Sequence, residues 1–423
     1  MTSTKDKMGR PIVVVTGLGV VTSLGAGKAD NWKKLTAGES GIHAITRFAT
    51  EGLKTRIAGS VDFLGVPQCT AALSEQLADL AAEEAIAQSG LGKPGDFPGP
   101  LFLAVPPIEM EWPQRLEVGA RSGSNDTVTY ADLMRVSEQF PAYHSRFLFG
   151  SVADHIAEKF GTRGSPISLS TACASGASAI QLGVEAIRRG DTDAALCIGT
   201  DGSVNPEAVI RFSLLSALST SNDNPQKAAR PFSKNRDGFV MAEGAGALVL
   251  ESYDAAKARG ATILGVVEGC GEKTDAFHRT RSSPDGKPII ACIKNALEDA
   301  GLAPADIDYV NAHGTSTPEN DKMEYLGCST VFGERMGKMP ISSNKSMIGH
   351  TLSAAGAIEA VFTVLTLQEQ RMPPTINYDV PDPAIPLDVV PNKARDARLK
   401  HAISNSFGFG GQNVSLVVGI EPA

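Results

Sequence analysis

The stretch Pro166-Ile-Ser-Leu-Ser-Thr-Ala-Cys-Ala-Ser-Gly-Ala-Ser-Ala-Ile180 combines a strand pattern with a helix pattern that follows it at once. Ile167 and Leu169 alternate with serines, as in a strand, and from Ile180 onward apolar residues recur at the spacing of one helix face. Cys173 lies at the turn between them, among small residues. Such a turn exposes a side chain, and the N-terminus of the following helix favours a thiolate. Cys173 is therefore a candidate nucleophile; the alternative is a small, inert core cysteine.

The same succession of strands and helices continues along the chain. Strand patterns occur at residues 11–15, 194–198 and 247–250, and an alanine-rich helix is expected from Leu73 to Ser89. This alternation predicts an α/β protein in which helices cover a mixed sheet.

Two pairs of segments resemble each other. Ile12–Gly19 resembles Ile263–Gly271, and Ser170–Ile180 resembles Ser353–Ile358. The two separations differ, which excludes a short-period repeat but allows an old duplication with insertions. On the sequence alone this indication of two related halves is weak.

The composition is that of a soluble globular protein without an excess of basic residues. The 423 residues include 39 lysines and arginines against 47 aspartates and glutamates, a formal charge of −8. Nucleic-acid binding needs a basic surface, which this balance does not indicate. No apolar run approaches the ~18 residues of a membrane span, and no secretory signal pattern is present. Six cysteines without C-x-x-C or zinc-ligand spacing indicate reduced thiols, so we expect a cytoplasmic protein.

Two histidines lie where a strand is expected to give way to a loop. His313 follows the apolar run 307–311, and His350 ends a loop before a helix of small residues. Catalytic groups of α/β proteins commonly occupy such positions, so both are candidates to act with Cys173. For each one alone, the alternative is a hydrogen-bonded structural histidine. The other histidines and one strand cysteine are expected to be structural or exposed: His43, His144, His155, His401 and Cys197.

Two glycine-rich segments do not match nucleotide-binding motifs. After Gly17-Leu-Gly19 the third glycine of G-x-G-x-x-G is replaced by Thr22, and Phe407-Gly-Phe-Gly-Gly411 lacks the lysine of a P-loop. We expect the second segment to form tight turns and to bring backbone N–H groups near a reacting atom.

Several longer motifs follow one another along nearly the whole chain. They are Thr171-Ala-Cys-Ala-Ser-Gly176, Arg230-Pro-Phe-Ser-Lys-Asn-Arg-Asp-Gly-Phe239, Asn311-Ala-His-Gly-Thr-Ser-Thr317, Asn344-Lys-Ser-Met-Ile-Gly-His350 and Asn405-Ser-Phe-Gly-Phe-Gly-Gly411. In this order they resemble the β-ketoacyl-acyl carrier protein synthases, the thiolase-fold condensing enzymes of fatty-acid synthesis. The set is far more specific than any one motif, and it favours the nucleophilic interpretation of Cys173.

The resemblance implies an α/β fold with a thiolase-like, five-layer αβαβα arrangement and two similar halves with mixed sheets. The N-terminal half would span residues 1–260 and carry the nucleophilic cysteine. The C-terminal half would span 261–423 and carry the two catalytic histidines. The resemblance is poorest from Leu101 to Phe149. We expect residues 98–150 to be a cap or insertion with little sheet of its own.

Details of the motifs indicate an elongating, type II synthase. No cysteine follows Cys328, unlike in thiolases, and His350 stands where initiating synthases have an asparagine. By resemblance, Cys173 would accept the acyl chain, and His313 and His350 would stabilise the enolate that forms as CO₂ leaves malonyl-acyl carrier protein. Lys345 would support the histidines. Glu359, in turn, would fix that lysine.

The resemblance also places residues around the substrate. Backbone N–H groups of Cys173 and Phe409 would form an oxyanion hole, and Phe409 would gate entry of the second substrate. Thr315 and Thr317 would bind the pantetheine arm. Asp275, His278 and Thr280 would lie on a mobile loop beside the acyl channel. No metal or redox cofactor is implied, since the phosphopantetheine arm arrives with the carrier protein.

The expected partners are acyl carrier protein and a second copy of the chain, as a homodimer. An acidic carrier needs a local basic patch, for which Arg211, Arg279 and Arg281 are candidates. One alternative is a ketosynthase of a specialised pathway that acts on very long or modified acyl groups or on polyketides. A thioester hydrolase fits the paired histidines and Lys345 less well, and the complete Cys-His-His set disfavours a non-catalytic partner subunit.

Overall fold

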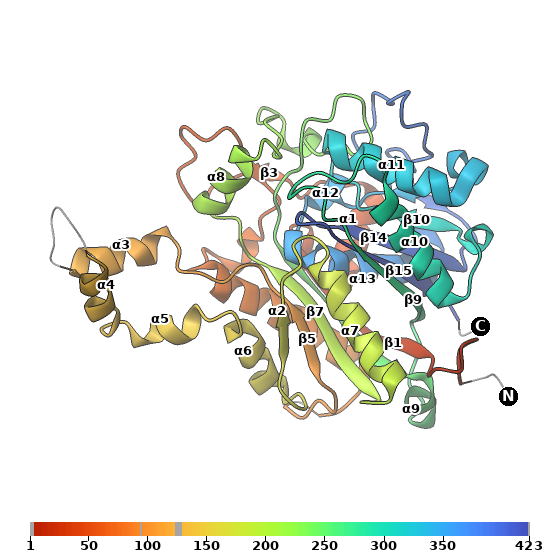
Figure 1. Ribbon diagram of the computed structural model, residues 1–423, viewed down its shortest axis with the longest axis horizontal. Coiled ribbons are helices and arrows are strands. Elements are labelled where there is room, and N and C mark those ends of the chain that lie inside the picture. Colours follow the sequence, from red (N-terminus) through yellow and green to blue (C-terminus); the bar gives the residue numbers. More distant parts are fainter. Residues whose placement is uncertain (1–3, 94, 123–128, 422–423) are drawn as a thin grey trace.

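Two sets of five strands form the centre of the computed structural model, which describes residues 4–93, 95–122 and 129–421 (Figure 1). In spatial order the first set is β1 (Val13–Thr22), β8 (Gly244–Ser252), β7 (Ala194–Asp201), β5 (Leu101–Ala104) and β6 (Ile167–Leu169). The second set is β9 (Gly265–Thr274), β15 (Gln412–Gly419), β14 (His401–Phe407), β10 (Tyr309–Asn311) and β11 (Ile341–Ser342). Each set has two antiparallel pairings followed by two parallel ones, and the sets join where β1 pairs with β9. The predicted mixed sheets in two similar halves are confirmed.

Helices form three layers around these strands. The outer helices are α2 (Thr70–Ser89) and α6 (Ser151–Phe160) on the first set and α10 (Lys287–Ala300) and α11 (Pro318–Phe332) on the second. The central helices α7 (Ser175–Arg189) and α13 (Ala355–Glu369) pack against each other and against strands of both sets. The five-layer αβαβα arrangement is therefore also confirmed. The expected boundary at residue 260 falls between α9 (Tyr253–Ala258) and β9, and stays a prediction.

The first pair of similar segments lies on equivalent strands. A Cβ atom added at Gly17 of β1 would lie 2.0 Å from the backbone oxygen of Ala85 in α2. One added at Gly271 of β9 would lie 2.2 Å from the backbone oxygen of Cys292 in α10. Glycine therefore allows each outer helix to approach its strand closely, which explains these residues without a nucleotide site.

The second pair of similar segments brings the two central helices together. A Cβ atom added at Gly176 of α7 would lie 2.5 Å from the backbone nitrogen of Ala357. One added at Gly356, in the first turn of α13, would lie 2.5 Å from the backbone nitrogen of Ala177. The contact is thus reciprocal, with equivalent glycines of the two halves facing each other. This agreement of sequence similarity, topology and contact supports the interpretation as a duplication.

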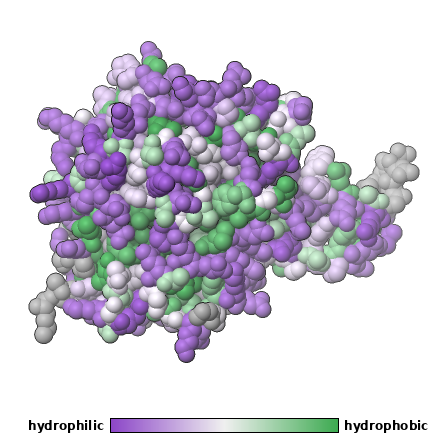
Figure 2. Space-filling model, turned by 180° about the vertical axis from the view of Figure 1, so that it is seen from behind, coloured by the Kyte–Doolittle hydropathy of each residue, from purple (hydrophilic) through white to green (hydrophobic). Residues whose placement is uncertain are grey.

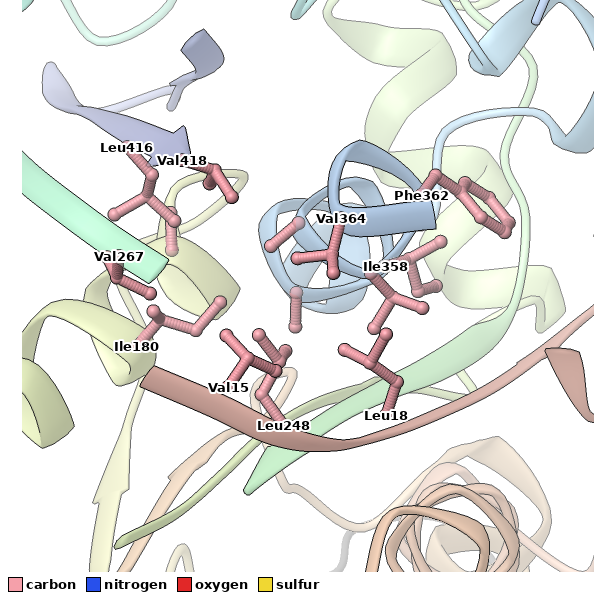
Figure 3. Packing of buried hydrophobic residues seen from close by; sticks show 14 of the residues in the cluster. Val15, Leu18, Ile180, Leu248, Val267, Ile358, Phe362, Val364, Leu416 and Val418 are labelled. Carbon is pink, nitrogen blue, oxygen red and sulfur yellow. The ribbon is translucent and has the colours of Figure 1, made fainter. Parts of the chain in front are cut away.

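The core is built around α13, whose residues from Ala355 to Leu367 are all buried. Figure 3 shows side chains of this helix among those of strands from both sets: Ile358 and Val364 of the helix, and Val15, Leu248, Val267 and Leu416 of the strands. Burial of this apolar surface fixes the two halves against each other.

The segment expected to be a cap differs from the prediction in its first part. Leu101–Ala104 form β5, which lies between β7 and β6 inside the first set of strands. The prediction was wrong here because prolines at 98, 100, 106 and 107 flank only five apolar residues and conceal the strand pattern. Beyond it, three helices project from the body as an arm, seen from both sides in Figures 1 and 2: α3 (Trp112–Arg121), α4 (Tyr130–Ser137) and α5 (Pro141–Arg146).

The shorter elements connect or flank these layers. They are the helices α1 (Lys28–Ala37), α8 (Pro206–Leu214) and α12 (Lys345–Ile348) and the strands β2 (Gly25–Ala26), β3 (His43–Ala44), β4 (Ile57–Ala58), β12 (Arg371–Met372) and β13 (Arg395–Asp396). Within the described ranges, no helix combines the length and the apolar character that crossing a membrane requires.

Candidate active site

Cys173 lies in a tight turn between β6 and α7. The preceding residue, Ala172, has a φ of 51°, which is unusual for a residue with a side chain. Ser175, the first residue of α7, holds the turn: its Oγ accepts a hydrogen bond from the N–H of Thr171 at 2.7 Å and donates one to the carbonyl of Ala172 at 2.6 Å. The strand–turn–helix arrangement predicted from the sequence is present.

The thiol of Cys173 is buried and faces a histidine. Its Sγ lies 3.1 Å from Nε2 of His350. Burial raises the pKa of Cys173 to about 11, against the opposing effects of the Phe409 backbone N–H and the Lys345 charge. The sequence led us to expect that the helix N-terminus would favour a thiolate, but the effect of burial is larger. In the absence of substrate the thiol therefore keeps its proton at neutral pH.

His350 is held so that its Nε2 carries the proton. Its Nδ1 lies 3.3 Å from the backbone N–H of Leu352, which donates to it, so in the neutral ring the proton is on Nε2. Burial and the charge of Lys345 lower the pKa of His350 well below its usual value. The imidazole is therefore neutral and acts as a hydrogen-bond donor toward the cavity.

His313 follows β10 and completes the set. The centroids of its ring and the His350 ring are 5.3 Å apart, with the rings nearly perpendicular. Nζ of Lys345 lies 3.5 Å from Nδ1 of His313, so the His313 proton is also expected on Nε2. Burial, then Lys345, lowers the pKa of His313 well below its usual value.

Lys345 and Glu359 form a buried ion pair behind the histidines. Lys345 is 2% exposed and Glu359, on α13, is 1% exposed. Burial raises the pKa of Glu359 to about 7, while the adjacent lysine lowers it. The pair holds a positive charge beside His313, which keeps that imidazole neutral.

Glu324 on α11 was missed by the sequence analysis. Its two carboxylate oxygens accept hydrogen bonds from the backbone N–H groups of His313 at 2.8 Å and Gly314 at 2.7 Å. Asn405 donates to the same carboxylate at 3.3 Å, and burial raises the pKa of Glu324 to about 7. The available signal was a pair of acidic residues, Asp321 and Glu324, at the three-residue spacing of one helix face.

A cavity of about 630 Å³ leads to this group of residues. The predicted substrate-contacting residues line it together with the cysteine and both histidines: Asp275, His278, Thr280, Thr315, Thr317 and Phe409. Asp275 is buried and holds its loop by accepting hydrogen bonds from the N–H groups of Phe277 at 3.0 Å and Ser283 at 2.7 Å.

A second cavity, of about 300 Å³, shares part of its lining with the first. Cys173 and Phe409 line both cavities, and Phe409 is half-buried. The second cavity is bounded by the Pro106-Pro107 turn after β5 and by α8. A group bonded to Sγ of Cys173 can therefore occupy the second cavity, while the two histidines line the first.

The three basic candidates do not lie together. Arg279 and Arg281 line the first cavity. Arg211 lines the second, where it is paired with Glu109. The histidines expected to be structural lie outside both cavities; His155 is beside Asp79 and His401 beside Glu268.

Cys173, His313 and His350 have the donor set of a metal site. One ligand atom from each lies within 4.8 Å of the others, and a thiolate with two imidazoles suits Zn²⁺. The ammonium nitrogen of Lys345, however, is 3.5 Å from Nδ1 of His313, so its positive charge opposes a second cation here.

Comparison with known proteins agrees with this geometry. The N-terminal domain of the β-ketoacyl synthases matches residues 10–256, and the C-terminal domain matches residues 264–379. The 3-oxoacyl-[acyl-carrier-protein] synthase 2 of Coxiella burnetii is 39% identical over 422 residues, covering 96% of this chain and 98% of that protein. The ketoacyl synthase alpha subunit of the tetracenomycin polyketide synthase of Streptomyces glaucescens is 36% identical, covering 94% and 95%.

Solved structures give the same result. A β-ketoacyl synthase from Burkholderia phymatum STM815 has a TM-score of 0.83 with 34% identity, covering 97% of this chain and all of that one. A type II polyketide ketosynthase, solved with its acyl-carrier protein, has a TM-score of 0.85 with 35% identity and the same coverage. By its sequence, its fold and the extent of these matches, the chain belongs to the β-ketoacyl synthase family.

Proposed function

We propose that the chain is an elongating β-ketoacyl-acyl carrier protein synthase. It condenses an acyl group held on Cys173 with malonyl-acyl carrier protein and forms 3-oxoacyl-acyl carrier protein and CO₂. The observation that carries this proposal is the meeting of one thiol and two neutral imidazoles in a single cavity, with Sγ of Cys173 3.1 Å from Nε2 of His350. The function of the relatives in fatty-acid synthesis supports it.

In the first step the acyl group moves from the carrier protein to the enzyme. Sγ of Cys173 attacks the thioester carbonyl, the bond to the pantetheine sulfur breaks, and the thiol proton passes to the departing sulfur. The developing oxyanion faces the backbone N–H of Phe409 and that of Cys173, at the N-terminus of α7. The acyl chain then lies in the second cavity.

In the second step malonyl-acyl carrier protein enters through the first cavity, where Thr315 and Thr317 line the path of its pantetheine arm. Nε2–H groups of His313 and His350 donate to the thioester oxygen as the carboxylate leaves as CO₂, so the enolate forms against two donors. Its carbon attacks the acyl carbonyl, and the Cys173 sulfur leaves and takes up a proton.

The buried ion pair supports this second step. Lys345 keeps Nδ1 of His313 occupied and the ring neutral, and Glu359 offsets the charge of the lysine. Decarboxylation drives formation of the carbon–carbon bond, so the proposed reaction uses no metal or redox cofactor. The phosphopantetheine arm belongs to the substrates.

We further propose two protein partners and a cytoplasmic location. Arg279, Arg281 and Lys322 line the first cavity and offer positive charge to an acidic carrier protein. A second copy of the chain would cover the arm, which exposes Trp112 and Leu116, and would pair with the open edge of β6. The location is supported by six cysteines that are all free.

The test is intact-mass measurement after incubation with a panel of acyl-carrier proteins. We expect an acyl adduct that is absent in Cys173→Ala. His350→Ala should still form the adduct but should release no CO₂ from malonyl-acyl carrier protein. Absence of an adduct with every member of the panel would refute the proposal.

The polyketide ketosynthases among the relatives make a specialised pathway the second candidate. The two functions differ in the number of condensations without reduction. Incubation with acyl- and malonyl-carrier protein, in the absence of a reductase, distinguishes them: a single condensation product favours fatty-acid elongation, and a series of longer poly-β-keto products favours the polyketide function.

A further inference from the structure

The second cavity has an apolar end and a charged end. Besides Cys173, the residues it shares with the first cavity are apolar, and they mark the end at which an acyl chain is attached: Phe212, Leu215, Leu352 and Phe409. Four carboxylates line the second cavity only: Asp201, Glu109, Glu111 and Glu207. A chain attached to Cys173 therefore has apolar side chains around its attached end, and the three glutamates lie in the part of the lining that the first cavity does not share.

Asp201 accepts hydrogen bonds from the backbone N–H groups of Ser203 at 3.1 Å and Ser353 at 3.0 Å. Two of the three glutamates have basic partners. Glu109 pairs with Arg211 and, at 3.1 Å, with Arg115. Glu207 lies 3.6 Å from Arg115 and accepts a hydrogen bond from the N–H of Trp112 at 2.8 Å. Their charges are thus largely balanced by the protein itself.

Glu111 differs from both. Its Oε1 accepts a hydrogen bond from the backbone N–H of Thr70 at 2.5 Å. Among the described residues no lysine or arginine forms an ion pair with Glu111, and its hydrogen-bond partners are the backbone and the side chain of Thr70. The side chain is half-buried, and burial raises its pKa. Because each carboxylate oxygen has two lone pairs, Glu111 keeps acceptor capacity for the occupant of the cavity or for water.

We infer that Glu111 determines which acyl chains the second cavity accepts, and that chains long enough to reach it are favoured when their far end carries a hydroxyl group. An alkyl end would displace water from the Glu111 carboxylate without replacing its hydrogen bond, which is unfavourable for a polar group removed from water. A hydroxyl at the same place donates to the carboxylate and removes that cost. This inference rests on the proposed function, because it assumes that the acyl chain is attached to Cys173.

The experiment measures the rate at which acyl-carrier proteins acylate Cys173, by intact mass. Straight chains from butanoyl to dodecanoyl are compared with the same chains carrying a terminal hydroxyl, and each rate is divided by the butanoyl rate of the same variant. Beyond the length that reaches Glu111, we expect the hydroxyl form to react about 10- to 100-fold faster, the effect of one buried hydrogen bond.

Two variants assign the preference to this side chain. Glu111→Leu should abolish it and admit the longer alkyl chains, and Glu111→Gln, which keeps the shape without the charge, should reduce it in the same direction. Glu117→Leu, in the helix α3 that follows Glu111 but outside the cavity, is the matched control and should keep the wild-type preference.

The outcomes separate the two proposals. Equal rates for hydroxyl and alkyl chains at every length, or an unchanged preference in both Glu111 variants, would overturn this inference while butanoyl acylation still supported the condensing function. If no acyl group, butanoyl included, is transferred to Cys173, the proposed function fails, and the inference fails with it.

Discussion

Lys345→Met tests whether the buried ion pair does what its position indicates. Methionine keeps most of the length of lysine but removes the charge, and it leaves the carboxyl of Glu359, which is 1% exposed, without its cation. Removing one partner of a buried pair costs about 3–5 kcal/mol. Because burial already raises the pKa of Glu359 to about 7, the carboxyl can take up a proton, and we expect the lower part of that range.

This loss corresponds to a measurable change in thermal stability. Unfolding entropy of about 2.1 cal/mol/K per residue, over the 423 residues of the chain, converts 3–5 kcal/mol into a decrease in Tm of about 3–6 °C. Adding Glu359→Gln removes the unpaired carboxyl and should restore most of that decrease. The matched control is Lys287→Met, which breaks the exposed pair with Asp285 and should lower Tm by less than about 1 °C.

Activity and stability should separate in the double variant. Without the ammonium beside Nδ1, His313 loses the group that fixes its proton on Nε2, so CO₂ release from malonyl-acyl carrier protein should stay low after stability has returned. Thermal unfolding and CO₂ release are the two measurements. The reasoning is wrong if Lys345→Met leaves Tm unchanged, or if the double variant releases CO₂ at the wild-type rate.

Three further predictions concern the same site. Because the pKa of Cys173 is raised to about 11, its thiolate fraction should grow about tenfold per pH unit from about pH 7 to 9, and the acylation rate should grow with it. An acylation rate that levels off near neutral pH would contradict this prediction. In Glu324→Gln the amide side chain cannot accept hydrogen bonds from both N–H groups of the His313 turn, so CO₂ release should slow about tenfold while the acylation rate stays within about twofold of wild type. An equal loss of both activities would indicate a general folding defect instead. Dialysis against a chelator should leave condensation unchanged, and a loss that only added Zn²⁺ restores would show that the thiol and imidazoles bind metal.

The fold and the central residues could be predicted because their signals are local. The elbow around Cys173 and the loops at His313 and His350 are each contained in fewer than ten consecutive residues. The glycines of β1 and β9 could be found in the same way, because close packing of a helix on a strand leaves a short, repeated pattern.

The features that were missed depend on approach in space. Glu324 lies 11 residues after His313, inside α11, and only the folded chain shows that its carboxylate accepts the N–H groups of that turn. Arg211 was expected to offer positive charge, but Glu109, 102 residues away in the sequence, neutralises it. The pKa of Cys173 likewise reflects the whole enclosure, so the helix pattern alone indicated the wrong direction.

The pairing of Cys173 with His350 has a consequence for the newly made polypeptide. The two residues are 177 positions apart, one after the edge strand of each half. At about 5–20 residues added per second, the ribosome delivers the histidine about 9–35 s after the cysteine. During that interval the first half can fold around a thiol that has no imidazole beside it. The growing chain therefore carries the cysteine without the imidazole that decarboxylation needs, and condensation becomes possible only when synthesis is nearly finished.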